Sequence, residues 1–337
     1  MRCIICDQER QESEEHVFPL AIGGCLATLR VCSDCNSKLG ARVDAPLIDH
    51  LAIVLRREEL KIAGRGGVPT TLDRVLGKSV LAREKSHQLR TRIDSATKTL
   101  DIRTIPNISK VTLPDGRVAD QLRLDVRDIG KLGETVRKFR KRRGLPPLAD
   151  DELNKMIDNA QANAVENINP EVIANIKVDP VGFMKFLVKI VYELAFCWLG
   201  DDYLCDPIAV KTREYLLGIM NEKYVSQPIL PMKGTVSFDL IKLWEMWSNN
   251  KNLHMAYATV CQEHIMICLK IFDIFYAGLV VTDTARKYLG MALSDPRLRF
   301  IAMDPVAGAI AESSFIEEMG RIARIMIGRE PNPAPSP

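Results

Sequence analysis

Two short cysteine pairs near the N-terminus constrain the folding of this chain more than any other feature. Cys3 and Cys6 form one C-x-x-C pair, and Cys32 and Cys35 form a second pair after 25 intervening residues. Each pair can form a tight turn that points two thiolates at one metal ion, and two such pairs complete a tetrahedral zinc site. The spacing exceeds the usual ~15–20 residues and leaves room for an inserted element. We therefore expect structural zinc at these four cysteines, with four free thiols as the alternative, and Cys25 is not expected to be a ligand.

Zinc also explains how so short a segment can fold. A segment of ~45 residues cannot bury enough apolar surface to fold by itself. Structural zinc contributes on the order of 10 kcal/mol of binding free energy, which becomes folding free energy. Because four thiolates leave no open coordination position, any chemistry must come from other residues.

The composition is that of an ordinary globular protein. The chain has 337 residues, of which 47% are hydrophobic and 26% charged, and this excludes general disorder. The most apolar stretch, residues 181–200, is interrupted by Lys185, Lys189 and Glu193, so no membrane span is expected. The N-terminus lacks the apolar core of a secretory signal, and a cytoplasmic protein is the expectation.

The net charge of +3 is unevenly distributed. Residues 1–50 contain five basic and eight acidic side chains, so this segment carries −3 and the remainder carries +6. A polyanion would therefore be held mainly by the remainder of the chain.

Further motif residues lie between and after the cysteine pairs. They are Glu15-His16, Pro19, Gly23-Gly24, Asn36 directly after Cys35, Lys38, Gly40 and Asp44. In this order and at these spacings, residues 1 to about 50 resemble the HNH endonuclease superfamily, also called ββα-metal nucleases. The resemblance is to the branch in which E-H-(I/V)-x-P lies between C-x-x-C and C-x-x-C-N.

The resemblance implies a β-hairpin carrying Glu15 and His16, followed by a helix that begins near Cys32 and carries Asn36. His16 matches the family's general base, which takes a proton from the attacking water. Glu15 and Asn36 match the two protein ligands of a divalent ion, and oxygen ligands favour Mg²⁺ or Mn²⁺. Because successive strand residues point to opposite faces, Glu15 and His16 need a local twist or bulge to serve one site.

Two departures from the family pattern leave alternatives open. No Asn lies between Val17 and Cys35 to act as the central Asn, and the final His of the common form is Asn36. Glu14 is an alternative metal ligand. His16 is alternatively a surface imidazole on a zinc-containing, non-catalytic nucleic-acid-binding module.

Residues 137–143 form a basic run. Its cationic members are Arg137, Lys138, Arg140, Lys141, Arg142 and Arg143. Such a run can contact phosphates, so these residues and Lys38 are candidate DNA contacts, with a solvent-exposed helix face as the alternative. His254 and His264 are expected to be sheet histidines rather than a second site.

The sequence predicts an α+β fold, in which a small N-terminal zinc-stabilised ββα-metal module precedes a larger mixed α/β domain with antiparallel strands. The expected ranges are 1–60 for the nuclease module, 61–130 for a β-rich segment, 131–328 for a mixed helical and strand domain, and 329–337 for a disordered tail. Alternating residues around Pro114-Asp115-Gly116 predict hairpins. Apolar periodicity predicts helices at 183–198 and 209–220, and residues 253–282 predict two or three adjacent strands.

The expected activity is metal-dependent endonucleolytic hydrolysis of DNA, with RNA as the alternative substrate. A role in bacterial defence or restriction is an expectation by analogy. The alternatives are a non-catalytic binding module and a nuclease gated by a ligand-sensing C-terminal domain, which would have an activating ligand or protein partner. A homodimer would suit double-strand cleavage, since one HNH site cuts one strand at a time.

Overall fold

The computed structural model divides the chain into two compact units, which are described separately. One unit comprises Met1–Pro69 and Val178–Pro337, and the other comprises Thr70–Lys177. The residues that the structure describes are 1–65, 67, 79–81, 88–93, 97, 99–164, 171–173, 180–221, 231–235, 247–248, 250–289 and 295–326. The predicted disordered tail at 329–337 lies outside these residues.

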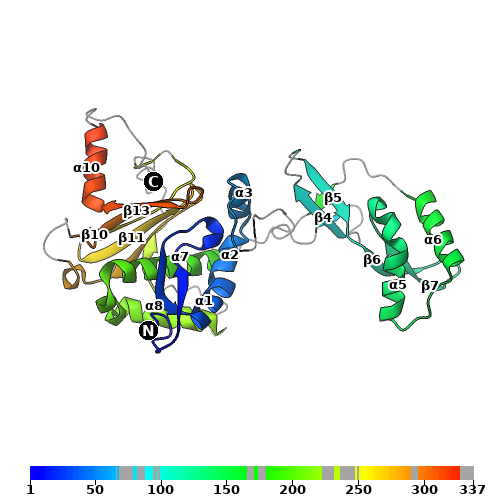
Figure 1. Cartoon of the computed structure of the whole chain (residues 1–337), viewed down its shortest axis with the longest axis horizontal. Coiled ribbons are helices and arrows are strands. Elements are labelled where there is room, and N and C mark those ends of the chain that lie inside the picture. Colours follow the sequence, from blue (N-terminus) through cyan, green and yellow to red (C-terminus); the bar gives the residue numbers. More distant parts are fainter. Residues whose placement is uncertain are drawn as a thin grey trace. The chain divides into compact units, whose positions relative to one another are not determined.

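The first unit begins with a hairpin and a helix. Strand β1 (Glu12–His16) pairs antiparallel with β2 (Ala27–Cys32), and α1 (Ser33–Leu39) follows directly. The chain continues through a π-helical turn (Gly40–Asp44) into α2 (Ala45–Ile48) and α3 (Leu51–Glu59). This is the predicted ββα arrangement (Figure 1).

A six-stranded antiparallel sheet forms the largest part of the same unit. Its strand order is β14-β13-β10-β11-β12-β9. The bounds are β9 (Gly234–Thr235), β10 (His254–Cys261), β11 (His264–Ile271), β12 (Phe275–Thr282), β13 (Arg299–Asp304) and β14 (Ala309–Ser314). Strands β10, β11 and β12 confirm the predicted strands at 253–282, and α10 (Phe315–Met326) follows the sheet.

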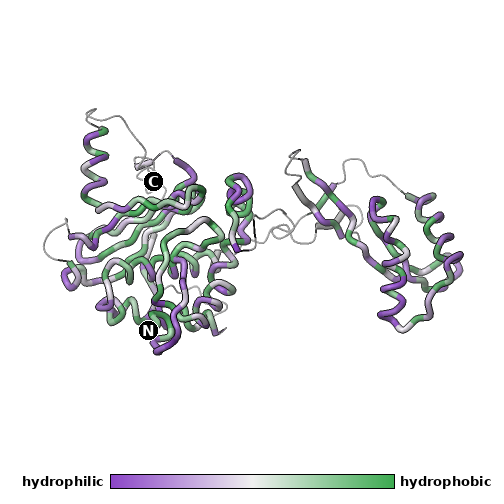
Figure 2. Tube along the Cα trace, viewed as in Figure 1, coloured by the Kyte–Doolittle hydropathy of each residue, from purple (hydrophilic) through white to green (hydrophobic). Residues whose placement is uncertain are grey.

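Helix α7 (Pro180–Leu199) joins the N-terminal module to this sheet. It contacts α2 on one side and strand β12 on another, and α8 (Pro207–Met220) packs beside it. The apolar side chains of the module, such as Ile4, Ile5 and Phe18, lie in one continuous core with those of α7 and the sheet. A helix that is apolar on nearly all faces is buried on nearly all faces. Figure 2 shows the hydrophobic residues along these elements.

The unit boundaries differ from the ranges expected from the sequence. Residues 1–60 share a core with the C-terminal elements, and residues 131–177 lie in the other unit. The physical reason is the one given for zinc, because a module this small buries its apolar surface only against further elements.

Within the described residues, the second unit contains two antiparallel groups of strands and two α-helices. The four-stranded sheet has the order β5-β4-β3-β8, and β6 pairs with β7. The bounds are β3 (Ser79–Leu81), β4 (Gln88–Ile93), β5 (Leu100–Thr104), β6 (Asn107–Thr112), β7 (Val118–Arg123), α5 (Leu132–Arg142), α6 (Asp150–Ala162) and β8 (Val172–Ile173). The β6–β7 hairpin turns at Gly116 with φ +81°, which confirms the predicted turn.

The architecture confirms the α+β class with antiparallel strands. Every strand pairing within the described residues is antiparallel. None of the helices in the described part of the chain has both the length and the apolar character needed to cross a bilayer.

Candidate active site and zinc site

The four cysteines of the two pairs meet at one point. The Sγ atoms of Cys3, Cys6, Cys32 and Cys35 all lie within 4.8 Å of one another. A tetrahedral zinc with Zn–S bonds of ~2.3 Å sets its sulfurs ~3.8 Å apart, and the Cys6 and Cys32 Sγ atoms are separated by 3.9 Å. The donor set and the spacing both fit structural zinc.

The surroundings of the cluster shift the pKa values of its thiols in both directions. A hydrogen bond from the Cys35 thiol lowers the pKa of Cys3 to about 4, and burial opposes this change. The Cys32 backbone N–H also donates to the Cys3 Sγ at 3.3 Å. Burial raises the pKa of Cys6, and the hydrogen bond to Cys3 raises the pKa of Cys35, so zinc binding must displace protons from these thiols.

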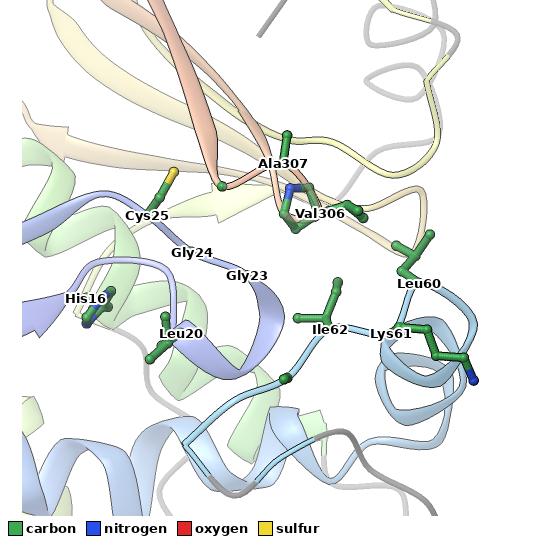
Figure 3. Close-up of a pocket in the computed structure, with 13 residues that line it drawn as sticks. His16, Leu20, Gly23, Gly24, Cys25, Leu60, Lys61, Ile62, Val306 and Ala307 are labelled. Atoms are coloured by element: carbon green, nitrogen blue, oxygen red, sulfur yellow. The ribbon is translucent and has the colours of Figure 1, made fainter.

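His16 lies at the end of β1 and lines an open pocket of about 470 Å³ (Figure 3). The other lining residues are Leu20 and residues 23–25, 60–63 and 305–308. The His16 side chain is half-buried, and its carbonyl oxygen accepts a hydrogen bond from the Lys189 Nζ at 2.9 Å. The backbone of His16 is thereby fixed while its imidazole stays accessible.

Glu15 points into the protein rather than into this pocket. Its side chain is only 4% exposed, and its Oε1 lies 2.5 Å from the Lys189 Nζ. The register shift in the hairpin lies between Ser13 and Glu15, so Glu15 and His16 stand in regular register opposite Thr28 and Ala27. Neighbouring residues of a regular strand face opposite sides. The structure therefore does not bring Glu15 and His16 together in one open site.

Lys189 is the centre of a buried charge cluster. Its ammonium lies 3.5 Å from an Asp44 carboxylate oxygen and 3.5 Å from a Glu193 carboxylate oxygen, in addition to Glu15. Burial raises the pKa of Asp44 to about 6 and the pKa of Glu193 well above its ordinary value, although Lys189 opposes both shifts. Burial alone would lower the pKa of Lys189, but the surrounding carboxylates raise it above its ordinary value. The ammonium is thus permanently charged.

Lys189 was not among the site residues predicted from the sequence. The only signal was its place with Lys185 and Glu193 in an apolar helix, which suggested a charged stripe. In the structure Lys189 and Glu193 are fully buried. A buried lysine in a helix of this kind requires a carboxylate partner, and the sequence does not say which one.

Asn36 braces the hairpin against helix α1. Its Nδ2 donates hydrogen bonds to the Ser13 Oγ at 3.0 Å and to the Glu14 carbonyl oxygen at 2.7 Å. These contacts fix β1 just before Glu15 and His16. Glu14 itself is exposed and lies two residues from His16, on the same side of the strand by alternation.

The two residues predicted to hold a catalytic divalent ion differ in this arrangement. The Glu15 carboxylate is buried against an ammonium, whereas Asn36 donates to the hairpin through its Nδ2, and an amide ligates a metal through its Oδ1. In the described ranges, the four cysteines are the only group of three or more His, Cys, Asp or Glu side chains gathered closely enough for a metal. We therefore assign no catalytic step to a bound ion.

His254 supports the loop that forms one wall of the pocket. Its Nδ1 accepts a hydrogen bond from the Phe272 N–H at 3.3 Å, so its Nε2 donates to the Ile22 carbonyl oxygen at 2.8 Å. Its ring also stacks on Phe18. Burial lowers the pKa of His254 to about 4, so it is a neutral structural histidine, and His264 pairs with Asp283 at 2.9 Å on the same sheet.

The basic run lies on helix α5 and the turn after it, in the second unit. Arg137 pairs with Asp150 at 3.1 Å, Lys138 with Glu134 at 2.6 Å, and Arg143 with Asp120 at 3.1 Å. Arg140 donates to the Pro146 carbonyl oxygen, and Lys141 and Arg142 are exposed. In the first unit, Lys38 pairs with Asp34 at 3.0 Å along α1. Exposed pairs of this kind are weak and exchange readily for phosphates.

Comparison with known families agrees with the geometry of the N-terminal module. Residues 3–52 match the family model described as HNH endonuclease, and this region includes the four clustered cysteines, His16 and Asn36. No curated protein and no solved structure matches the chain. The family match supports a nuclease-type function and a nucleic-acid substrate in general terms. Residues 3–52 are thus the part of this chain that is similar to the HNH endonuclease family.

Proposed function

We propose that this chain is an endonuclease that hydrolyses phosphodiester bonds in DNA, with His16 as the general base. The observation that carries the proposal is the position of His16. It lies on the hairpin of the HNH-matched region, with its backbone held by Lys189 and its imidazole on an open pocket. An imidazole takes up a proton near neutral pH, as removal of a proton from an attacking water requires.

The other residues of the site hold the hairpin in place. The zinc cluster anchors both ends of the ββα module, because Cys3 and Cys6 precede the hairpin while Cys32 and Cys35 begin the helix. Asn36 fixes β1 from the helix side, and Lys189 fixes it from the core side. The hairpin is therefore held from both sides at the residue that presents the imidazole.

Plasmid cleavage tests this proposal directly. Wild type is compared with His16→Ala, and His264→Ala is a matched control because His264 is a half-buried histidine paired with Asp283. We expect wild type and His264→Ala to cut and His16→Ala to lose at least a hundredfold in rate, as removal of a general base does. Equal zinc content and equal circular dichroism show that the fold is intact. Cutting by zinc-replete His16→Ala at the wild-type rate would refute the proposal.

Metal and substrate arms accompany the same experiment. Mg²⁺, Mn²⁺ and a chelator are compared, and Glu15→Gln and Asn36→Ala test the predicted ligands. RNA of the same sequence replaces the plasmid in a parallel series. Size-exclusion chromatography with and without DNA tests the expected homodimer.

A second candidate function is a non-catalytic nucleic-acid-binding module. The observation in its favour is the burial of Glu15 against Lys189, which removes the family's acidic ligand from the open site. Gel-shift titration distinguishes the two functions, because this candidate predicts salt-sensitive binding without cleavage of DNA or RNA under any metal condition.

A further inference from the structure

The pocket beside His16 is assembled from segments far apart in the sequence. The loop after β1 and the segment after α3 form two sides, and the turn between β13 and β14 forms the third (Figure 3). Residues 305–308 lie in this turn, outside the region that matches the HNH family. The chain beyond the nuclease module therefore supplies part of the surface next to the proposed base.

The turn is closed by hydrogen bonds and is seated directly on the module. The Asp304 Oδ1 accepts hydrogen bonds from the backbone N–H groups of Val306 at 2.8 Å and Ala307 at 3.0 Å. Gly23 has φ +82°, and a Cβ at this position would collide with Pro305. This close approach means that the third wall is already formed before any ligand arrives.

The pocket has apolar side chains on exposed edges. Val306 is 60% exposed at the tip of the turn and Leu20 is 38% exposed on the opposite loop, while Ile62 is buried between them and the protein interior. Lys61 is exposed at the rim, and its side chain extends outward (Figure 3). The pocket thus combines apolar side chains at its edges, a lining that is in large part polar, an imidazole, and a cation at its rim.

We propose that this pocket holds an unpaired nucleobase adjacent to the phosphodiester bond on which His16 acts. This inference rests on the proposed nuclease function and adds a substrate class to it, namely DNA with an extrahelical or single-stranded nucleotide. The volume of about 470 Å³ lies within the ~300–1,000 Å³ range of small-molecule pockets. A base stacked within a duplex cannot enter such a pocket, whereas a flipped base is held between apolar side chains.

The charge at the rim suits the same ligand. A nucleobase entering the pocket carries its flanking phosphates along the rim, where the Lys61 ammonium can contact one of them. The apolar edges formed by Leu20 and Val306 disfavour a phosphate inside the pocket itself. The base is therefore directed inward and the backbone outward, past His16.

The test uses duplexes with one central 2-aminopurine, either fully paired or placed as an unpaired bulge, with phosphorothioate bonds beside it to slow cleavage. Binding is followed by anisotropy, and the environment of the base is followed by 2-aminopurine fluorescence. We expect wild type to bind the bulged duplex at least tenfold more tightly than the paired duplex and to change the 2-aminopurine emission only in the bulged duplex.

Val306→Asp is the diagnostic variant, and Val118→Asp is its matched control, because Val118 is an equally exposed valine (64%) on β7 of the second unit. We expect Val306→Asp to lose at least fivefold in affinity for the bulged duplex and to keep its affinity for the paired duplex. Leu20→Asp, on the opposite wall of the pocket, should also lower the affinity for the bulged duplex. Val118→Asp should change neither affinity.

Two outcomes would overturn the inference. One is equal wild-type affinity for bulged and paired duplexes, and the other is a loss in Val306→Asp no greater than in Val118→Asp. Failure of the proposed nuclease function is separate, since it appears as absence of plasmid cleavage whatever the binding preference. Cleavage with no preference for unpaired bases would refute the pocket assignment alone.

Discussion

Replacement of Lys189 by Met removes the only cation of the buried cluster while keeping the length of its side chain. In wild type the ammonium lies 2.5 Å from Glu15, 3.5 Å from Asp44 and 3.5 Å from Glu193. The variant leaves these carboxyl groups buried without that ammonium. Loss of one partner of a buried pair costs about 3–5 kcal/mol, so we expect the free energy of unfolding to fall by this amount near neutral pH.

The cost should depend on pH in a defined direction. A buried carboxylate without a cation avoids its charge by taking up a proton, at a cost of about 1.4 kcal/mol for each pH unit above its ordinary pKa. The native variant then binds about one proton more than its unfolded chain does, so its stability falls as pH rises. Between pH 6.5 and 8, above the pKa of about 6 for Asp44, the variant should lose about 2 kcal/mol more than wild type.

Urea unfolding followed by circular dichroism at several pH values measures both quantities. Lys185→Met is the matched control, because Lys185 lies one helical turn earlier on α7 and is only half-buried. The double variant with Glu15→Gln should recover part of the lost stability, since it removes the nearest carboxylate. A loss below 1 kcal/mol, or a loss that does not change with pH, would refute the account of this cluster.

Three other perturbations have expected outcomes. Cys32→Ser should abolish zinc binding and lower the melting temperature, whereas Cys205→Ser, at an exposed cysteine, should change neither. Elemental analysis measures the zinc content, and stoichiometric zinc in Cys32→Ser would contradict the prediction. Burial lowers the pKa of His254 to about 4, so wild type should lose about 3 kcal/mol of stability as pH falls from 6.5 to 4. Urea unfolding at several pH values should show that the stability of His254→Gln depends less steeply on pH, by up to one proton. An unchanged pH dependence would exclude this residue as the cause. The double variant Lys141→Ala/Arg142→Ala should reduce the slope of log affinity for DNA against log salt concentration by about two. Anisotropy measures this slope, with Arg117→Ala as the control. An unchanged slope would indicate that the basic run is only a solvent-exposed helix face.

Local sequence patterns were sufficient to predict the four-cysteine cluster and the ββα module. Two cysteines separated by two residues form a turn that needs no distant partner, and the pairs meet because β1 and β2 form a hairpin. The β6–β7 turn at Pro114-Asp115-Gly116 and the strands at 253–282 were likewise predicted, since alternation and turn chemistry act within a few residues.

Alternation predicted that Glu15 and His16 point to opposite faces, but not that Glu15 is the one that faces the core, nor which residue it meets there. The motif places Glu15 next to His16, but the regular strand register turns Glu15 toward the core, where Lys189 meets it from 174 positions further along the chain. The same holds for Asn36, whose amide braces Ser13 and Glu14 in the hairpin. Side-chain direction and partner choice depend on which elements pack together.

The sequence by itself therefore predicted the four-cysteine cluster, the α+β class, and the hairpin and helix of the HNH-matched module, and it named His16 as the candidate base. Only the tertiary structure decided that the module shares its core with α7 and the six-stranded sheet, that Lys189 neutralises Glu15, and that Pro305 and Val306 complete the pocket beside His16. The physical reason is the separation along the chain over which each interaction acts. Turn geometry, strand alternation and metal-ligand spacing act between near neighbours, whereas burial of charge and the shape of a pocket follow from the packing of distant segments.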